Sequence, residues 1–144
     1  MSENKNLETG HVMTIEASKE EVMKWLEFKK VRQSTINNSE EAIDNLAGAI
    51  AEGLLVLNDG FEWEQKLLSP IKTEDSTTET LVYKPRLAAW EIQESMKGVK
   101  TSDVFGIMFG IVAKLTGKFP QMIKKLDTED YGICQNIALF FVPK

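Results

Sequence analysis

The chain has 144 residues, of which 42% are hydrophobic and 27% are charged, and its formal net charge is −5. This length and composition are typical of one globular domain with a real core, and they exclude a largely disordered chain. An acidic chain without a cluster of lysine and arginine does not fit a protein that binds phosphate backbones, so we expect no nucleic-acid partner. The lysine pairs Lys29-Lys30 and Lys124-Lys125 are interpreted as solvated helix faces.

Membrane insertion and secretion are also not expected. No apolar run reaches the roughly 18 to 20 residues that a membrane helix needs. Residues 1–5 lack the basic start and the apolar core of a secretory signal, so we expect the protein to stay in the cytoplasm. The single cysteine, Cys134, cannot form an internal disulfide, and its apolar surroundings in the sequence predict a packed thiol.

The N-terminal part is predicted to be a flexible segment, residues 1–17, followed by a helical pair, residues 18–53. Within the first segment, residues 11–15 alternate weakly and could form a short strand. Ser18 and Glu21 form a capping-box pattern, which predicts that a helix begins at Ser18. Trp25 is expected to anchor this helix in the core, with an exposed partner-binding role as the alternative.

A second helix is predicted from Glu40, after a turn at residues 37–39, and it ends at Gly53. Its apolar positions fall on one face. Small residues at positions 47–49 and 51 favour close packing of another helix within the molecule, and self-association is the alternative.

A β-hairpin is predicted over residues 54–67, because two apolar runs flank Asn58-Asp59-Gly60 and Asp-Gly supplies positive φ in tight turns. Pro70 is expected to close the second strand. The polar stretch 73–80 predicts a loop or a hairpin tip. Residues 81–83 can add a third strand, which Pro85 ends, and a helix is expected from about Leu87 to Met96.

The densest apolar pattern runs from Thr101 to Phe141 and predicts three short helices. Asp103 can cap the first helix and Gly117 can end it. Pro120 suits the start of the second helix, and the third begins at Asp127 or Thr128. The broad apolar face expected on the first helix consists of Val104, Phe105, Ile107, Met108, Ile111, Val112 and Leu115.

These elements predict an α+β fold that is mostly α, with several short helices packed on one antiparallel hairpin or three-stranded sheet. Residues 54–144 form the hairpin and the C-terminal helical unit. Residues 18–144 are expected to fold as one compact domain.

The sequence carries little material for catalysis. It has one histidine, His11, and it shows no P-loop, dinucleotide fingerprint or metal-ligand spacing. Asp127, Glu129 and Asp130 are explained as carboxylates at the positive end of a helix. We therefore expect neither an enzyme nor a cofactor or metal site.

Short motifs follow one order in the second half of the chain: Tyr83-Lys84-Pro85-Arg86-Leu87, then an apolar helix, Leu115-Thr116-Gly117, Leu126-Asp127, Asp130 and another apolar helix. This order, over roughly residues 61–141, resembles the tail assembly chaperones of long-tailed bacteriophages. Residues 1–58 contribute nothing to the resemblance. It implies a non-enzymatic protein of the host cytoplasm that binds the tape measure protein and the tail tube protein.

Two other functions stay open at this point. The protein could be a stable structural component of a phage tail, baseplate or connector, and it would then be found in the virion. It could also be a small host adaptor or regulatory domain. In each case we expect a protein partner, and the residues predicted to face it are Trp25, Trp63, Tyr83, Arg86, Trp90, Phe119, Phe140 and Phe141.

Overall fold

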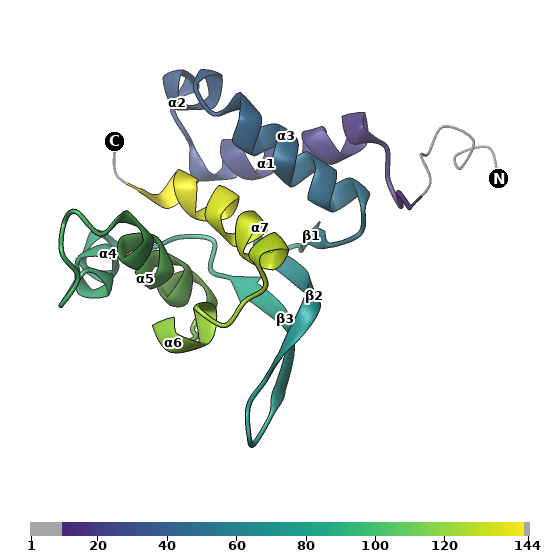
Figure 1. The fold of residues 1–144 in the computed structure, drawn as a ribbon. Helices are drawn as coiled ribbons and strands as arrows, with labels where there is room; N and C mark the ends of the chain where they lie inside the picture. Colours follow the sequence, from purple (N-terminus) through teal and green to yellow (C-terminus); the bar gives the residue numbers. More distant parts are fainter. Residues whose placement is uncertain (1–9, 143–144) are drawn as a thin grey trace.

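A three-stranded antiparallel sheet, in the order β1-β2-β3, packs with seven α-helices in the computed structural model, which describes residues 10–142 (Figure 1). The elements are α1 (Ile15–Lys29), α2 (Gln33–Asn37), α3 (Glu40–Ala51), β1 (Leu55–Leu57), β2 (Trp63–Lys72), β3 (Thr77–Tyr83), α4 (Ala89–Ser95), α5 (Val104–Thr116), α6 (Pro120–Ile123), α7 (Thr128–Ala138) and the 3-10 turn η2 (Leu139–Phe141). The predicted α+β, mostly α class is confirmed.

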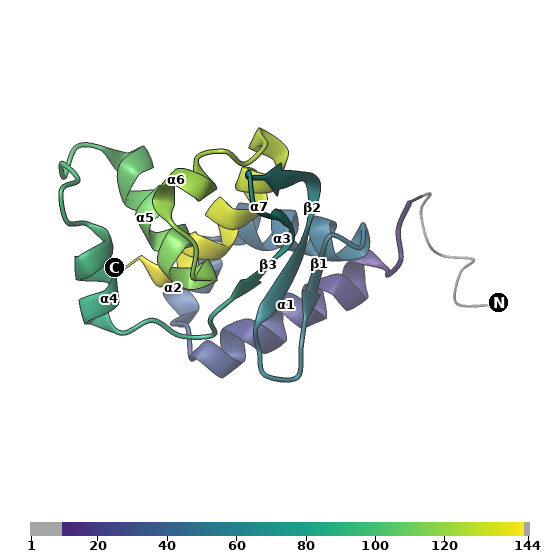
Figure 2. The same cartoon turned by 90° about the horizontal axis from the view of Figure 1, so that it is seen from below.

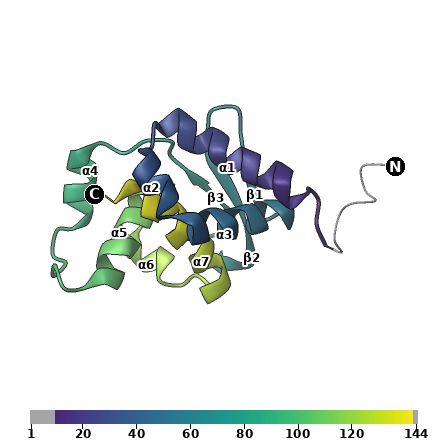
Figure 3. The same ribbon diagram turned by 90° about the horizontal axis from the view of Figure 1, so that it is seen from above.

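Helix α7 lies at the centre of the helical packing. It contacts α3 on one side and α5 on the other, and it also reaches β2. Helices α1 and α3 pack side by side (Figure 3), and the view from below has the sheet in front of them (Figure 2). One continuous set of buried apolar side chains runs from Val22 to Phe140, so the helical pair and the C-terminal helices share a core.

The N-terminal helix begins earlier than its sequence signal predicted. Thr14 is the N-cap, and its hydroxyl accepts a hydrogen bond from the Ala17 N–H at 3.1 Å. The predicted start, Ser18, is instead buried inside α1, where its hydroxyl donates to the Thr14 carbonyl oxygen. The short strand predicted at residues 11–15 is wrong, because threonine caps a helix as serine does and here it comes first. Residues 1–9 of the predicted flexible segment lie outside the described residues.

The second predicted helix matches α3, but a short helix, α2, was missed between the two. The predicted hairpin is also present, since Leu55 pairs with Gln65 and Leu57 with Trp63. Its turn differs from the prediction: the positive φ belongs to Phe61, at 59°, and not to Gly60. The Asn58 side chain explains this, because its Oδ1 accepts hydrogen bonds from the N–H groups of Gly60 and Glu62 and so fixes the turn.

Strand β2 does not end at Pro70 but continues to Lys72. Lys66 pairs with Thr80 and Ile71 pairs with Thr78, so β2 advances by five residues over a stretch in which β3 advances by two. The three extra residues form a bulge, where Pro70 fits because it has no N–H to offer a neighbouring strand. β3 begins at Thr77, which shortens the predicted loop at residues 73–80 to a tip at residues 73–76.

The three C-terminal helices have the predicted ends. Asp103 Oδ1 accepts from the Gly106 N–H, Gly117 ends α5 with a φ of 69°, and α6 starts at Pro120. A Cβ on Gly110 would lie 2.6 Å from the Ser95 carbonyl oxygen, so the glycine lets α4 approach α5 closely. The predicted apolar face of α5 is buried only in part, because Val104 and Phe105 in its first turn are exposed. The face is wider than the neighbouring helices cover.

Candidate functional site

A buried polar cluster joins the sheet to α7, and we call it the Tyr83 junction: Gln65, Tyr83, Asp130 and Cys134. The Tyr83 hydroxyl lies 2.5 Å from Gln65 Oε1 and 2.8 Å from Cys134 Sγ. Gln65 Nε2 donates to the Asp130 carbonyl oxygen at 2.9 Å. The Asp130 carboxylate accepts from the N–H groups of Leu68 and Ser69 in the bulge, at 2.8 and 3.0 Å.

The Tyr83 junction has the properties of a structural element. Burial raises the pKa of the Cys134 thiol to about 12 and raises the pKa of Tyr83 well above its ordinary value. Both groups therefore keep their protons at neutral pH, and a thiol in this state is a poor nucleophile. The predicted packed thiol is confirmed. Asp130 has a role beyond its favourable place at the positive end of the helix dipole, because its carboxylate accepts the hydrogen bonds of two β2 N–H groups that have no acceptor on a neighbouring strand.

The motif residues behind the family resemblance mostly connect elements of the fold. Tyr83 and Asp130 belong to the Tyr83 junction, and the Lys84 N–H donates to the Leu115 carbonyl oxygen at 2.8 Å. Asp127 caps α7 by accepting from the Glu129 N–H. The motif order thus describes how the strand end, the end of α5 and the start of α7 are held together.

Several residues predicted to face a partner lie in the core. Trp25 packs edge-on against Trp63 and Phe140, with ring centroids 5.5 Å apart in both pairs. Together with Tyr83, these three side chains are buried, so none of the four is available on the surface of the folded chain. Phe141 is half-buried at the edge of the same cluster, 6.0 Å from Trp25. Large aromatic side chains were expected at a partner surface, but the core takes them first because they bury the most apolar area.

Cations and aromatic rings meet where α1 ends, and we call this group the cationic rim: Phe28, Lys29, Phe61, Arg86 and Phe141. The Lys29 ammonium lies 3.6 Å from the centroid of the Phe141 ring. The Arg86 guanidinium lies 4.9 Å from the Phe28 ring, and its Nη2 donates to the Phe28 carbonyl oxygen. Phe28 in turn stacks on Phe61 with parallel rings 4.2 Å apart. Arg86 is exposed, whereas Lys29 is half-buried and is not the solvated lysine that the sequence predicted.

The remaining predicted residues, Trp90 and Phe119, are exposed on the C-terminal helices. We call the segment that carries them and Phe105 the α4–α6 surface; the exposed fractions of Trp90, Phe105 and Phe119 are 62%, 68% and 79%. They are the only aromatic residues among the large exposed hydrophobic side chains in residues 10–142. Phe119 also lines a groove of about 410 Å³ that runs between α4, α5 and the start of α6. Ion pairs from Lys84 to Glu91 and from Lys114 to Glu94 hold α4 in place.

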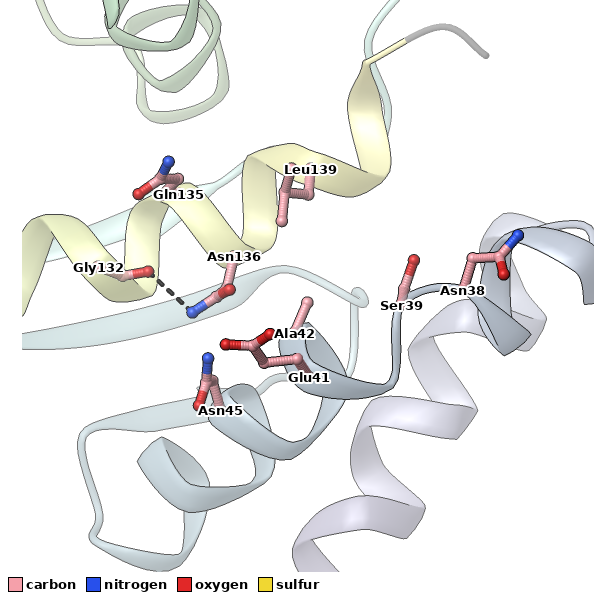
Figure 4. Close-up of a pocket in the computed structure, with 9 residues that line it drawn as sticks. All are labelled: Asn38, Ser39, Glu41, Ala42, Asn45, Gly132, Gln135, Asn136 and Leu139. Carbon is pink, nitrogen blue, oxygen red and sulfur yellow. Dashed lines mark hydrogen bonds between the residues drawn. The ribbon is translucent and has the colours of Figure 1, made fainter.

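A second, polar pocket of about 580 Å³ lies between α3 and α7 (Figure 4). Side chains of Glu41 and Asn45 from α3 and Asn136 from α7 point toward one another in it, whereas Gln135 points away. Asn136 is tied down by a hydrogen bond to the Gly132 carbonyl oxygen. Glu41 is the only ionisable residue in the lining, so the pocket can hydrogen-bond a ligand but has no acid–base pair.

Gln65, Lys29 and Phe61 were not identified from the sequence. A signal existed for Gln65, because it shares the inward face of β2 with Trp63 and Leu67, and a buried glutamine needs hydrogen-bond partners. The other two depend on contacts between distant segments. Phe61 stacks on Phe28, 33 residues earlier in the chain, and Lys29 lies over the ring of Phe141, 112 residues later.

Comparison with protein-family models, with curated proteins and with solved structures found no match. Within residues 10–142, no helix combines the length and apolar character needed to cross a membrane. The same described part of the chain holds no group of three or more histidine, cysteine, aspartate or glutamate residues arranged to bind a metal ion.

Proposed function

We propose that this protein is a non-enzymatic tail assembly chaperone of a long-tailed bacteriophage, which binds the tape measure protein and the tail tube protein during assembly. The observation that supports binding is the α4–α6 surface, where Trp90, Phe105 and Phe119 expose their rings to solvent. Of the three, Phe119 lines the groove, and exposed aromatic side chains are typical of sites that bind other proteins. The phage context rests on the motif order between Tyr83 and Asp130.

The groove on this surface suits an amphipathic helix of the partner. Its walls combine the apolar side chains of Ala113, Phe119 and Pro120 with charged groups at the rim, including Lys97 and Lys118. An apolar stripe can bury itself against Phe119 while acidic positions of the same helix face the lysines. A shallow groove with one exposed aromatic anchor, Phe119, favours moderate affinity, which allows a chaperone to release its client.

The first experiment compares cell lysate with finished particles. The tagged protein is expressed in cells that produce the corresponding phage, and both fractions are analysed by mass spectrometry. A chaperone co-purifies with the tape measure and tube proteins from lysate and is absent from particles. Fixed stoichiometry in particles would instead make it a structural component, and recovery with host proteins alone would make it an adaptor domain.

The second experiment tests the α4–α6 surface itself. Phe105→Ser and Phe119→Ser are expected to reduce client recovery by tenfold or more, because each removes an exposed anchor without touching the core. Leu68→Ser is the matched control, since Leu68 is 58% exposed but lies on β2. Unchanged recovery with both phenylalanine variants would move the binding surface elsewhere, even if the chaperone function held.

A further inference from the structure

The polar pocket between α3 and α7 differs in chemistry from the groove on the α4–α6 surface. Its volume of about 580 Å³ suits a small ligand or a side chain, and no lysine, arginine or aromatic residue of the described part of the chain lines it. Six of its nine lining residues have polar side chains, four of them amides: Asn38, Ser39, Glu41, Asn45, Gln135 and Asn136. The lining therefore offers hydrogen-bond partners and a single negative charge.

Three of these side chains converge from the two walls of the pocket. Glu41 and Asn45 are four residues apart, so they lie on the same face of α3, and Asn136 points toward them from α7 (Figure 4). Asn136 Nδ2 donates to the Gly132 carbonyl oxygen at 3.0 Å. Because a carbonyl oxygen only accepts, this bond sets the orientation of the amide and leaves Oδ1 as the acceptor that Asn136 offers to a ligand.

Gly132 keeps the α7 wall of the pocket open. Glycine inside a helix is less favourable than alanine, so its presence there needs a reason. Its backbone does not have a positive φ, and a Cβ at this position would meet no atom within 4 Å. Neither conformation nor close packing therefore requires glycine. Since Gly132 lines the pocket, the missing side chain leaves room for a ligand.

Glu41 supplies the charge of the pocket. It forms no ion pair within residues 10–142. Glu40 lies in the same first turn of α3, where both carboxylates meet the positive end of the helix dipole, but only Glu41 lines the pocket. A carboxylate accompanied by amide oxygens, without a cation, is complementary to a cationic ligand that has several N–H donors.

We propose that this pocket binds a guanidinium group, such as the side chain of an arginine. A guanidinium is planar, has five N–H donors and can bond both oxygens of one carboxylate. Glu41 accepts two of these hydrogen bonds, and the amide oxygens of Asn45 and Asn136 accept others. An ammonium group has only three donors and is strongly hydrated, so it matches this set of acceptors less well. The site is independent of the α4–α6 surface and of the proposed chaperone function.

The test titrates three capped tripeptides into the full-length protein and follows backbone and side-chain amide signals by NMR. Their central residue is arginine, lysine or citrulline, which has the shape of arginine without its charge, and glycines flank it. The arginine peptide is expected to shift the side-chain signals of Asn45 and Asn136 and to bind more tightly than the other two by about fivefold or more. Equal binding of the arginine and citrulline peptides, or of the arginine and lysine peptides, would overturn the proposal.

Free arginine, titrated in the same way, identifies the source of the guanidinium group. Tighter binding of the peptide than of free arginine assigns the pocket to an arginine within a protein segment. Tighter binding of free arginine assigns it to a small guanidino compound. Both outcomes support a guanidinium site, whereas binding of neither would overturn it.

Two variants test the residues of the pocket. Glu41→Gln is expected to weaken binding of the arginine peptide by about tenfold or more, whereas the matched control Glu40→Gln changes it by less than about twofold. Gly132→Leu fills part of the pocket, so it is also expected to weaken binding by about tenfold or more. Its thermal unfolding temperature should equal or exceed that of the wild type, because leucine favours a helix more than glycine does. Wild-type affinity of Glu41→Gln, or of folded Gly132→Leu, would overturn the proposal.

Discussion

The Tyr83 junction and the α4–α6 surface both depend on the C-terminal helices, and together they reverse the usual relation between polarity and burial, in which polar groups are exposed and apolar groups are buried. In the junction, the phenol, the amide and the thiol are enclosed and bond to one another, and the enclosed carboxylate accepts from two backbone N–H groups of β2. On the α4–α6 surface, aromatic rings stand in solvent. Buried polar groups fix a geometry because each unpaired one would be unfavourable, whereas exposed rings contribute little until a partner covers them.

The largest effect is expected from a charge placed in the packed part of α5. Ile111 is 1% exposed, so Ile111→Asp buries an unpaired carboxylate and removes about 4 kcal/mol or more of folding free energy. Urea unfolding followed by circular dichroism measures the loss. A variant that unfolds at the wild-type urea concentration would contradict the buried position of this helix.

A smaller loss of folding free energy is expected when a substitution at Asp130 removes hydrogen bonds of the Tyr83 junction. Asp130→Ala leaves the N–H groups of Leu68 and Ser69 without their acceptor, and the expected cost is about 2–4 kcal/mol. The matched control is Asp127→Ala, which removes an exposed helix cap and costs about 1 kcal/mol. Equal losses from the two variants would show that Asp130 acts only as a residue of the first helical turn.

The junction also predicts a dependence of stability on alkaline pH. The pKa of Cys134 rises from 9.0 to about 12 on folding, so between these values the folded thiol keeps its proton while the unfolded thiol loses it. The contribution of Cys134 is therefore constant below about pH 9 and falls by about 1.4 kcal/mol per pH unit above it. Lys29, whose pKa is lowered on folding to about 8, contributes a rise above pH 8, so the Cys134 part is obtained as the difference between wild type and Cys134→Ala. Urea unfolding at pH 7, 9 and 10 measures the slope.

Cys134→Ala is the control for this titration. It removes the Cys134 contribution above about pH 9 and leaves the contributions of Tyr83 and Tyr131, whose pKa values are also raised on folding, and of Lys29, whose pKa is lowered. Equal pH profiles of wild type and Cys134→Ala up to about pH 10.5 would mean that the thiol is accessible to solvent.

The smallest effect is expected on the α4–α6 surface. Phe105→Asp changes an exposed residue in the first turn of α5, where a carboxylate meets the positive end of the helix, so stability changes by about 0.5 kcal/mol or less. Thermal unfolding compares it with Ile111→Asp on the same helix. If Phe105→Asp unfolded as Ile111→Asp is expected to, Phe105 would be part of the core and the α4–α6 surface would not expose it.

Much of the fold could be predicted because its signals are local. The ends of a helix depend on a few neighbouring residues. Examples are the N-caps Asp103 and Asp127, the glycine that ends α5, Gly117, and the proline that starts α6, Pro120. The first helix was placed too late because two residues one helical turn apart, Thr14 and Ser18, can both cap.

The candidate sites were predicted less well, because exposure is set by distant contacts. The sequence assigned Phe105 to the packed face of its helix and Trp25 to either the core or a partner surface, and only packing of the whole chain separates them. Gln65, Asp130 and Arg86 depend on partners about 60 residues away. Spacing within a helix or strand carries no information on such pairs.

The bulge in β2 gives the hairpin an unusual place in the order of folding. Hairpins usually form from neighbouring residues, but here two N–H groups of β2 have their acceptor on α7, more than 60 residues further along the chain. During synthesis, residues 63–83 leave the ribosome well before residue 130. The bulge of β2 can therefore reach its final structure only after α7 has been synthesised. A ribosome-bound chain that stops before α7 should therefore show an incompletely protected hairpin, and its protection should rise sharply once α7 has emerged.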